Sequence, residues 1–234
     1  MSFFYMLMYE HPLISVGVIA TLVFAAICSA KVKSVYSKYG SMYTSGKTPA
    51  CEVARQILDA NGLYNVQIVR CSGHLTDHYD PKNNVIALSD TVYGSPTVGA
   101  IGVAAHECGH AIQYATGYGP IKARNTMAPI VSICSSSWIW IFIIGGIIGS
   151  LFMTQVAIVF YAVVVLFQLI TLPVEFNASK RAMDTVLSMG FLHGNELMGA
   201  RKVLSAAAMT YVASLLVSTM QLIRLIVRMN RRRN

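Results

Sequence analysis

Residues 105–110 read Ala-His-Glu-Cys-Gly-His and lie inside a run of small and apolar residues from Val98 to Gln113. On a helix, His106 and His110 leave the same face one turn apart, so both imidazoles can bind one tetrahedral metal ion. Glu107 follows the first histidine, where its carboxylate can reach a metal-bound water without binding the metal. The pattern predicts one Zn²⁺ per chain, with His106 and His110 as ligands and Glu107 as the catalytic base.

The residues around the motif predict a helix. Ser95 and Pro96 provide a possible N-cap and first-turn proline, and Gly117 together with Gly119 and Pro120 marks a stop. The alternative is a partly buried helix with two ordinary histidines. Such a helix would more readily carry leucine and alanine at these positions, so we favour the metal site.

Composition indicates a membrane protein. Of the 234 residues, 55% are hydrophobic and only 12% are charged, and the mean hydropathy is +0.55. The net charge is +8, but the basic residues cluster beside apolar segments, which favours contacts with a lipid bilayer over binding of nucleic acid. These residues are Lys31, Lys33, Lys38, Arg224, Arg228, Arg231, Arg232 and Arg233.

The cysteines do not form a disulfide framework. There are five, an odd number, and they show no C-x-x-C spacing. Reduced thiols fit a domain that faces the cytosol. The cysteines are Cys28, Cys51, Cys71, Cys108 and Cys134.

Changes in composition divide the chain into five segments. Residues 1–30 hold an N-terminal transmembrane anchor, since 12–30 are uncharged and long enough to span once. Residues 31–124 form a small soluble domain with the metal helix, and 125–174, which carry no charge, form a transmembrane hairpin. Residues 175–202 are expected to be helical, and 203–234 are an apolar helix with a basic tail. A cleaved signal peptide is the alternative for 12–30, but Glu10 and the lack of preceding Lys or Arg favour an anchor.

The soluble segment reads as a mixture of helix and strand. A helix opens at Thr48 and Pro49, and two β-like runs follow at Val66–Val69 and Val85–Leu88. Residues 73–81 between them predict a loop or a curled strand end. We expect the second run to lie along the cleft and pair with an extended substrate. The fold class is therefore α+β, mainly α, in a multi-pass membrane protein.

The positions of Lys and Arg predict an orientation. Positive residues follow the first span and flank the hairpin, so the metal domain should face the cytosol. If Val203–Ile223 also crosses the membrane, the terminal arginines lie outside, against this rule. That helix could instead lie along the surface, and both readings stay open.

A catalytic zinc needs a third protein ligand. Gln113 and Thr116 stand where the extended H-E-x-x-H-x-x-G-x-x-H motif requires glycine and histidine, so the ligand must come from elsewhere. Glu175 leads the candidates because it follows Pro173, which predicts a helix over Val174–Met189 beginning at the membrane surface. The alternative is that Glu175 is an acid at a helix N-terminus, where the helix dipole stabilises its negative charge. The other candidates are Glu196, His193, Asp184, His74 and His78.

Three separated segments, 75–81, 103–113 and 173–182, resemble the YugP-like neutral zinc metallopeptidases of bacterial membranes. The segment Glu175–Ser179 is more distantly similar to the E-x-x-A-D stretch of HtpX-type membrane peptidases, except that Ser179 stands in place of aspartate. The resemblance implies that Glu175 is the third zinc ligand and that the chain is a zincin-like metallopeptidase (H-E-x-x-H plus glutamate) of the bacterial cytoplasmic membrane. Ser179 could still accept an imidazole N–H, more weakly than aspartate.

These observations predict a zinc-dependent endopeptidase acting on membrane or membrane-proximal proteins. The main alternative is a non-catalytic membrane protein with a structural or regulatory metal, which a fourth protein ligand such as His78 would favour. A transporter fits poorly, because residues 125–174 carry no charged side chain that could line a transport path. Tyr114, Tyr211 and Arg181 are candidate oxyanion donors, and Cys108 reads as a small packing residue. The sequence does not predict substrate identity or oligomeric state.

Overall fold

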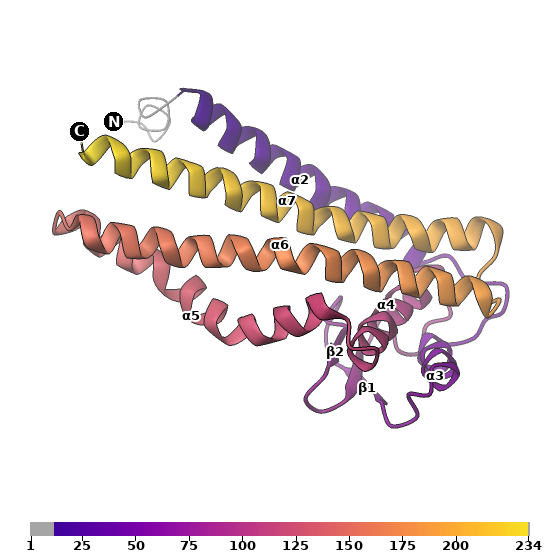
Figure 1. The fold of residues 1–234 in the computed structure, drawn as a ribbon. Helices are drawn as coiled ribbons and strands as arrows, with labels where there is room; N and C mark the ends of the chain where they lie inside the picture. Colours follow the sequence, from indigo (N-terminus) through magenta and orange to yellow (C-terminus); the bar gives the residue numbers. More distant parts are fainter. Residues whose placement is uncertain (1–11, 234) are drawn as a thin grey trace. The chain divides into compact units, whose positions relative to one another are not determined.

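The structure is a computed structural model that describes the backbone from Pro12 to Arg233 and side chains to Asn230 (Figure 1). The predicted anchor over residues 1–30 is therefore described only from Pro12, and the terminal side chains Arg231 to Arg233 lie outside the described part. The described chain is mainly helical with one small sheet, as the α+β membrane fold predicts.

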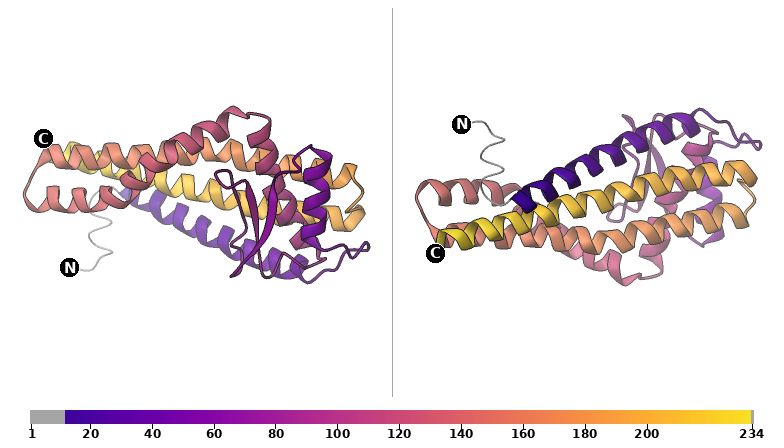
Figure 2. Two further views of the ribbon diagram at one scale, coloured as in Figure 1. Left: turned by 90° about the horizontal axis from the view of Figure 1, so that it is seen from below. Right: turned by 90° about the horizontal axis from the view of Figure 1, so that it is seen from above.

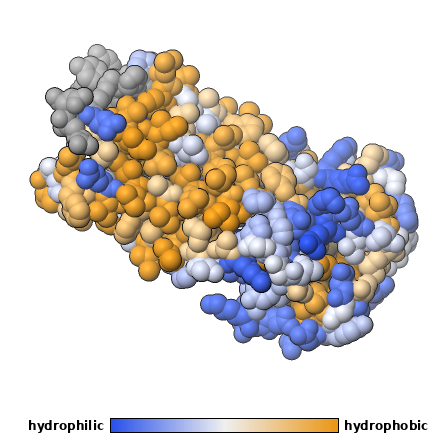
Figure 3. Space-filling model, viewed as in Figure 1, coloured by the Kyte–Doolittle hydropathy of each residue, from blue (hydrophilic) through white to orange (hydrophobic). Residues whose placement is uncertain are grey.

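The chain divides into two compact units. We call Met1–Ser29, Ala123–Leu172 and Thr210–Asn234 the apolar unit, and Ala30–Lys122 with Pro173–Met209 the site unit. Hydrophobic side chains dominate the surface over the helices of the apolar unit, and hydrophilic ones gather over the site unit (Figure 3). The five-segment division predicted from composition stays a prediction.

Four described helices are long and apolar enough to cross a membrane. They are α2 (Pro12–Gly40), α5 (Gly119–Ile147), α6 (Leu151–Ser188) and α7 (Gly194–Arg233). Within the apolar unit, α6 and α7 lie side by side (Figure 2), and Tyr161 of α6 and Leu225 of α7 share a buried cluster. The Trp138 ring of α5 stacks at a tilt on Tyr161, with centroids 4.4 Å apart.

The prediction that a separate helix begins at Pro173 is wrong. Pro173 was predicted to begin a helix over Val174–Met189, but α6 runs unbroken from Leu151 to Ser188 with Pro173 inside it. Proline removes one N–H from the helix ladder, and the regular bonds on both sides keep the helix together. Glu175 consequently lies within a long helix rather than at a helix N-terminus, and the dipole explanation for it no longer applies.

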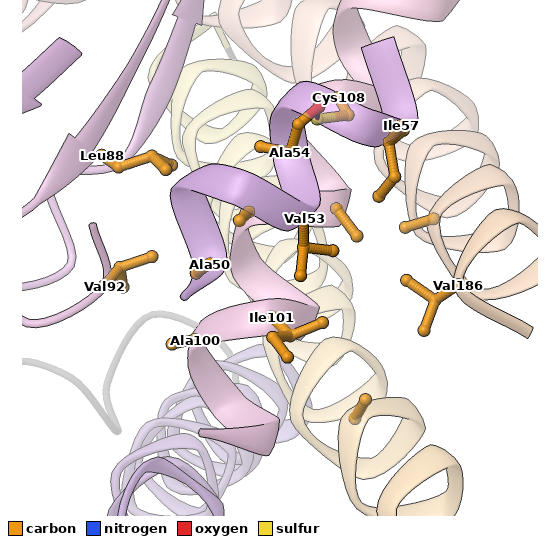
Figure 4. Close-up of a cluster of buried hydrophobic side chains, with 14 of the residues drawn as sticks. Ala50, Val53, Ala54, Ile57, Leu88, Val92, Ala100, Ile101, Cys108 and Val186 are labelled. Atoms are coloured by element: carbon orange, nitrogen blue, oxygen red, sulfur yellow. Dashed lines mark hydrogen bonds between the residues drawn. The ribbon is translucent and has the colours of Figure 1, made fainter. Parts of the chain in front are cut away.

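The hydrophobic core of the site unit is built around α3 (Ala50–Ala60) and α4 (Val98–Ala115). The apolar stripe of α3 is fully buried, and Figure 4 shows Val53, Ala54 and Ile57 beside Ile101 of α4 and Val186 of α6. The Cys108 thiol in α4 donates to the Ala54 carbonyl at 3.6 Å. This packing fixes the helix that carries the motif.

The sheet has three strands in the order β1 (Gln67–Cys71), β3 (Val85–Ser89), β2 (His78–Asp80). β3 pairs in parallel with β1 and antiparallel with β2. Residues 73–81, predicted as a loop or a curled strand end, contain the short strand β2. The prediction that Val85–Leu88 pairs with substrate is wrong. β3 is the central strand, so both its hydrogen-bonding edges are already used, and β1 and β2 form the edges.

Candidate metal centre

α4 carries the motif, but it begins two residues later than Ser95 and Pro96 predicted. Thr97 is the N-cap, and its hydroxyl accepts from the Ala100 N–H at 3.4 Å. Pro96 stays outside the helix because its carbonyl accepts from the Thr44 N–H at 2.9 Å, which holds the chain extended there. The C-terminal stop is confirmed, with Thr116 as C-cap and Gly117 at φ +67°.

Three side chains from two helices meet at one point. Oε2 of Glu175 lies 3.3 Å from Nε2 of His106 and 3.7 Å from Nε2 of His110. One ligand atom from each residue lies within 4.8 Å of the other two, and the group could hold a metal ion. Glu175 is 2% exposed and His110 9%, so the cluster is largely shielded from solvent.

The donor set fits zinc. A tetrahedral zinc with ligand bonds of about 2.0–2.1 Å separates its ligand atoms by about 3.3 Å. The two measured separations lie at or slightly above this value. Two imidazoles and one carboxylate are also the ligand types that catalytic zinc sites use, with a fourth position left for water.

The other ring nitrogen of each histidine is also held. Nδ1 of His106 lies 3.2 Å from the Ser179 hydroxyl, and Nδ1 of His110 lies 3.1 Å from Oε1 of Gln113. Such bonds fix the orientation of metal-binding imidazoles and direct Nε2 toward the metal. The Ser179 contact is the one that its place in the sequence suggested.

A glycine permits the close approach of the two helices. A Cβ on Gly109, between the two histidines, would lie 2.5 Å from the Ala178 backbone oxygen in α6. No real side chain tolerates that separation, so only glycine lets α4 lie this near to α6. The same contact brings both histidines within reach of Glu175.

The electrostatics of the site favour a bound cation. Burial alone would lower the pKa of His110, but the nearby carboxylates of Glu175 and Glu107 raise it above its ordinary value. A proton therefore competes for the position between His110 and Glu175 that a metal ion would take. Cys108 is different, because full burial raises the pKa of its thiol and leaves it a packing residue, as expected.

Glu107 lies beside this cluster in α4 and is 8% exposed. Its carboxylate is close enough to His110 to raise the pKa of that imidazole. A carboxylate in this position can accept a proton from a water next to the metal.

The other candidate ligands lie elsewhere. Glu196 accepts from the Ser45 N–H at 2.9 Å and from its hydroxyl at 2.6 Å, and Asp184 pairs with Lys180 at 2.7 Å. The His74 ring packs edge-on against Tyr36, with centroids 5.5 Å apart.

The remaining histidines are placed by their own segments. Nδ1 of His78 lies 2.8 Å from the Thr76 carbonyl, and no helix forms around His74 and His78. His193 and Glu196 line a separate cavity of about 220 Å³. Among the candidates, Glu175 is the residue that the structure brings to the two motif histidines.

Two of the oxyanion candidates make contacts with residues outside the metal group. Arg181 donates through Nε to Oδ1 of Asn177 at 2.8 Å, so its guanidinium serves α6. Tyr114 is 45% exposed and meets the Tyr79 ring of β2 edge-on at 6.3 Å. Tyr211 belongs to the apolar unit.

Gln113 is a site residue that sequence reasoning did not identify. In the sequence it stands out only as the residue that replaces the glycine of the extended zinc motif. Its spacing of three from His110 was the available signal, because residues at i and i+3 share a helix face.

Comparisons with known proteins identify the family of the chain. Residues 14–230 match the model of a family described as "Putative neutral zinc metallopeptidase". The chain belongs to this family. It is also 46% identical over 196 residues to "Putative membrane protease YugP" of Bacillus subtilis, which covers 84% of this chain and 87% of that protein. No solved structure matches the chain.

Family membership confirms the resemblance seen in the sequence and implies zinc as the metal. The group formed by His106, His110 and Glu175 offers a suitable place for it. The similarity to a membrane protease and the four apolar helices together support a membrane protein.

Proposed function

We propose that this protein is a zinc-dependent endopeptidase in which His106, His110 and Glu175 bind the metal and Glu107 is the catalytic base. The observation that carries the proposal is the meeting of three ligand atoms with Glu107 beside them. The metal group has three members within the described residues, as expected for a catalytic rather than a closed structural site.

The residues have separable roles in this mechanism. Zinc held by these three residues would supply Lewis acidity, polarising a carbonyl and lowering the pKa of a bound water to about 7. Glu107 accepts the proton of the attacking water and passes it to the leaving amine. His106 and His110 remain neutral ligands, and Glu175 contributes one negative charge, so the centre keeps a net positive charge that favours a developing oxyanion.

The substrate is proposed to be a protein segment presented near the membrane. Glu175 comes directly after the uncharged stretch 125–174. Its helix is therefore continuous with an apolar segment. An extended substrate can add to the free side of an edge strand, and β2, which packs near α4, is the better placed edge. The site unit is proposed to face the cytosol of a bacterial cell.

Zinc content tests the ligand set. Detergent-purified protein should carry one zinc per chain, and His110→Ala and Glu175→Ala should both lose it. Asp184→Ala is the matched control, since Asp184 is an exposed acid on the same helix as Glu175 and should keep the metal. Tight zinc binding by Glu175→Ala would place the third ligand elsewhere.

Cleavage tests the catalytic role. Zinc-loaded wild type should cleave members of a quenched-peptide library in detergent, and Glu107→Gln should keep its zinc while losing about 100- to 10,000-fold in rate. A Glu107→Gln protein as active as wild type would refute the mechanism. Loss of activity without loss of zinc separates Glu107 from the ligands.

A further inference from the structure

Gln113 has a fully buried side chain whose polar atoms all have partners. Its Oε1 lies 3.1 Å from Nδ1 of His110, and its Nε2 donates to the Val174 carbonyl at 2.8 Å and to Oδ1 of Asn177 at 3.0 Å. The residue is 0% exposed, so water does not substitute for these bonds. It therefore connects one zinc-site histidine with the helix that carries Glu175.

The direction of these bonds is decided by the groups at their ends. A backbone carbonyl such as that of Val174 can only accept, and the Arg181 guanidinium can only donate. Because Arg181 donates to Oδ1 of Asn177, this oxygen is an acceptor and the atom of Gln113 facing it must be Nε2. Oε1 of Gln113 consequently faces His110 as an acceptor.

This arrangement selects one tautomer of His110. Since Oε1 can only accept, Nδ1 must carry the proton and donate it to Gln113. The lone pair of the neutral ring then lies on Nε2, the atom 3.7 Å from Glu175. An imidazole with the opposite tautomer has no lone pair there and cannot bind a metal through that atom.

We propose that Gln113 is a positioning residue that holds His110 in its metal-binding tautomer. Arg181 acts through Asn177 to fix the direction of the hydrogen bonds that Gln113 makes. Gln113 also ties His110 to Val174 and Asn177, which flank Glu175. The inference rests on the proposed ligand set of His106, His110 and Glu175. It adds that the geometry of that set depends on residues that do not touch the metal.

The two histidines are held unequally. The Ser179 hydroxyl beside His106 can either donate or accept, so it allows both tautomers of that ring. The side-chain amide of Gln113 beside His110 allows only the tautomer with the proton on Nδ1. Replacement of Gln113 should therefore weaken metal binding more than replacement of Ser179.

Metal binding by the full chain in detergent tests this inference. Zinc affinity is measured by competition with a chelator, and geometry by the visible spectrum of the Co²⁺-loaded protein. Gln113→Met should lose about 10- to 100-fold in zinc affinity and alter the Co²⁺ spectrum, and Ser179→Ala should lose less. Equal zinc affinity in Gln113→Met and wild type would overturn the inference.

A matched pair at Asn177 separates positioning from packing. Asn177→Asp keeps an oxygen that accepts from both Arg181 and Gln113, so it should bind zinc nearly as wild type does. Asn177→Leu has a similar volume but no acceptor, and its affinity should fall with that of Gln113→Met. Equal affinities in the two variants would overturn the role of Asn177 and Arg181.

Two further variants isolate the causes. Ile101→Val removes a methylene from the buried face of α4 away from the metal group, so it should lower thermal stability without changing the Co²⁺ spectrum. His110→Ala should abolish tight binding. If His110→Ala loses tight zinc binding but Gln113→Met keeps it, only the positioning role of Gln113 is refuted. If His110→Ala binds zinc as wild type does, the ligand set itself is refuted.

Discussion

At the scale of single residues, the site depends on what surrounds each ligand as much as on the ligands. Glu175 is a carboxylate with 2% exposure, and such burial is costly unless cations or hydrogen-bond donors compensate. Here both motif histidines approach it, at 3.3 and 3.7 Å. A metal ion or a shared proton is therefore part of the stable state of this cluster.

We predict that the stabilisation by zinc grows as pH rises. The pKa of His110 is raised above 6.5 in the fold, so in the metal-free protein its proton stabilises the folded state fully below 6.5. That contribution is lost as pH rises through the folded pKa. Zinc needs the neutral ring, so the unfolding temperature with zinc minus that without zinc should increase over the same range.

The control for this prediction is His110→Ala. Its unfolding temperature with and without zinc should differ little at any pH in the range. A zinc effect in wild type that stays constant from below pH 6.5 to well above it would contradict the proton competition.

At the scale of elements, the site is a contact between α4 and α6. Neither helix is amphipathic in a way that singles out this pairing, and the contact depends on small residues where the backbones meet. Gly109 and Ala178 provide this contact, and a second small pair, Gly102 and Ala200, lies where α4 meets α7. The motif supplies the ligands, while these small residues set the distance between them.

We predict opposite effects for two glycine substitutions in α4. Gly109→Ala places a Cβ 2.5 Å from the Ala178 oxygen, so the helices must separate, at a cost of about 1–3 kcal/mol in unfolding free energy and with weaker zinc binding. Gly102→Ala places its Cβ 3.4 Å from the Ala200 Cβ, close to ordinary contact. It should be tolerated or slightly stabilising, since alanine favours helix. Thermal unfolding and chelator competition on both variants check this, and equal zinc affinities would contradict it.

At the scale of the whole molecule, the order of the four apolar helices bears on topology. Residues 30–122 run from the C-terminal part of α2 to the start of α5, and residues 173–209 run from the C-terminal part of α6 into the first part of α7. If each of these helices crosses the membrane once, both parts of the site unit lie on one side. The α5–α6 turn and the C-terminus then lie on the other.

We predict this topology for reporter fusions in cells. A reporter in the loop at residues 72–76 should report the cytosol, and reporters at residues 148–150 and after residue 234 should report the outside. A cytosolic signal from the C-terminal fusion would mean that α7 lies along the surface, the alternative that the terminal arginines favour. A cytosolic signal at 148–150 would contradict the hairpin.

The sequence by itself determined the metal-binding motif and the class of this protein. The pair His106 and His110, the glutamate between them and the uncharged stretch 125–174 follow from local spacing and composition, which are readable without tertiary contacts. The apolar stripe of α3 and the stop after α4 were predictable for the same reason.

Only the tertiary structure decided how residues distant in the sequence meet the motif. Glu175, Ser179 and Gln113 act through contacts between α4 and α6, and the sequence separations of 69 and 73 residues from His106 to Glu175 and Ser179 carry no periodic signal. The central place of β3 and the continuity of α6 through Pro173 also depend on packing and pairing over long distances. The local sequence pattern indicates which secondary structure a segment can form. Which other segments it packs against depends on how the whole fold buries its apolar side chains.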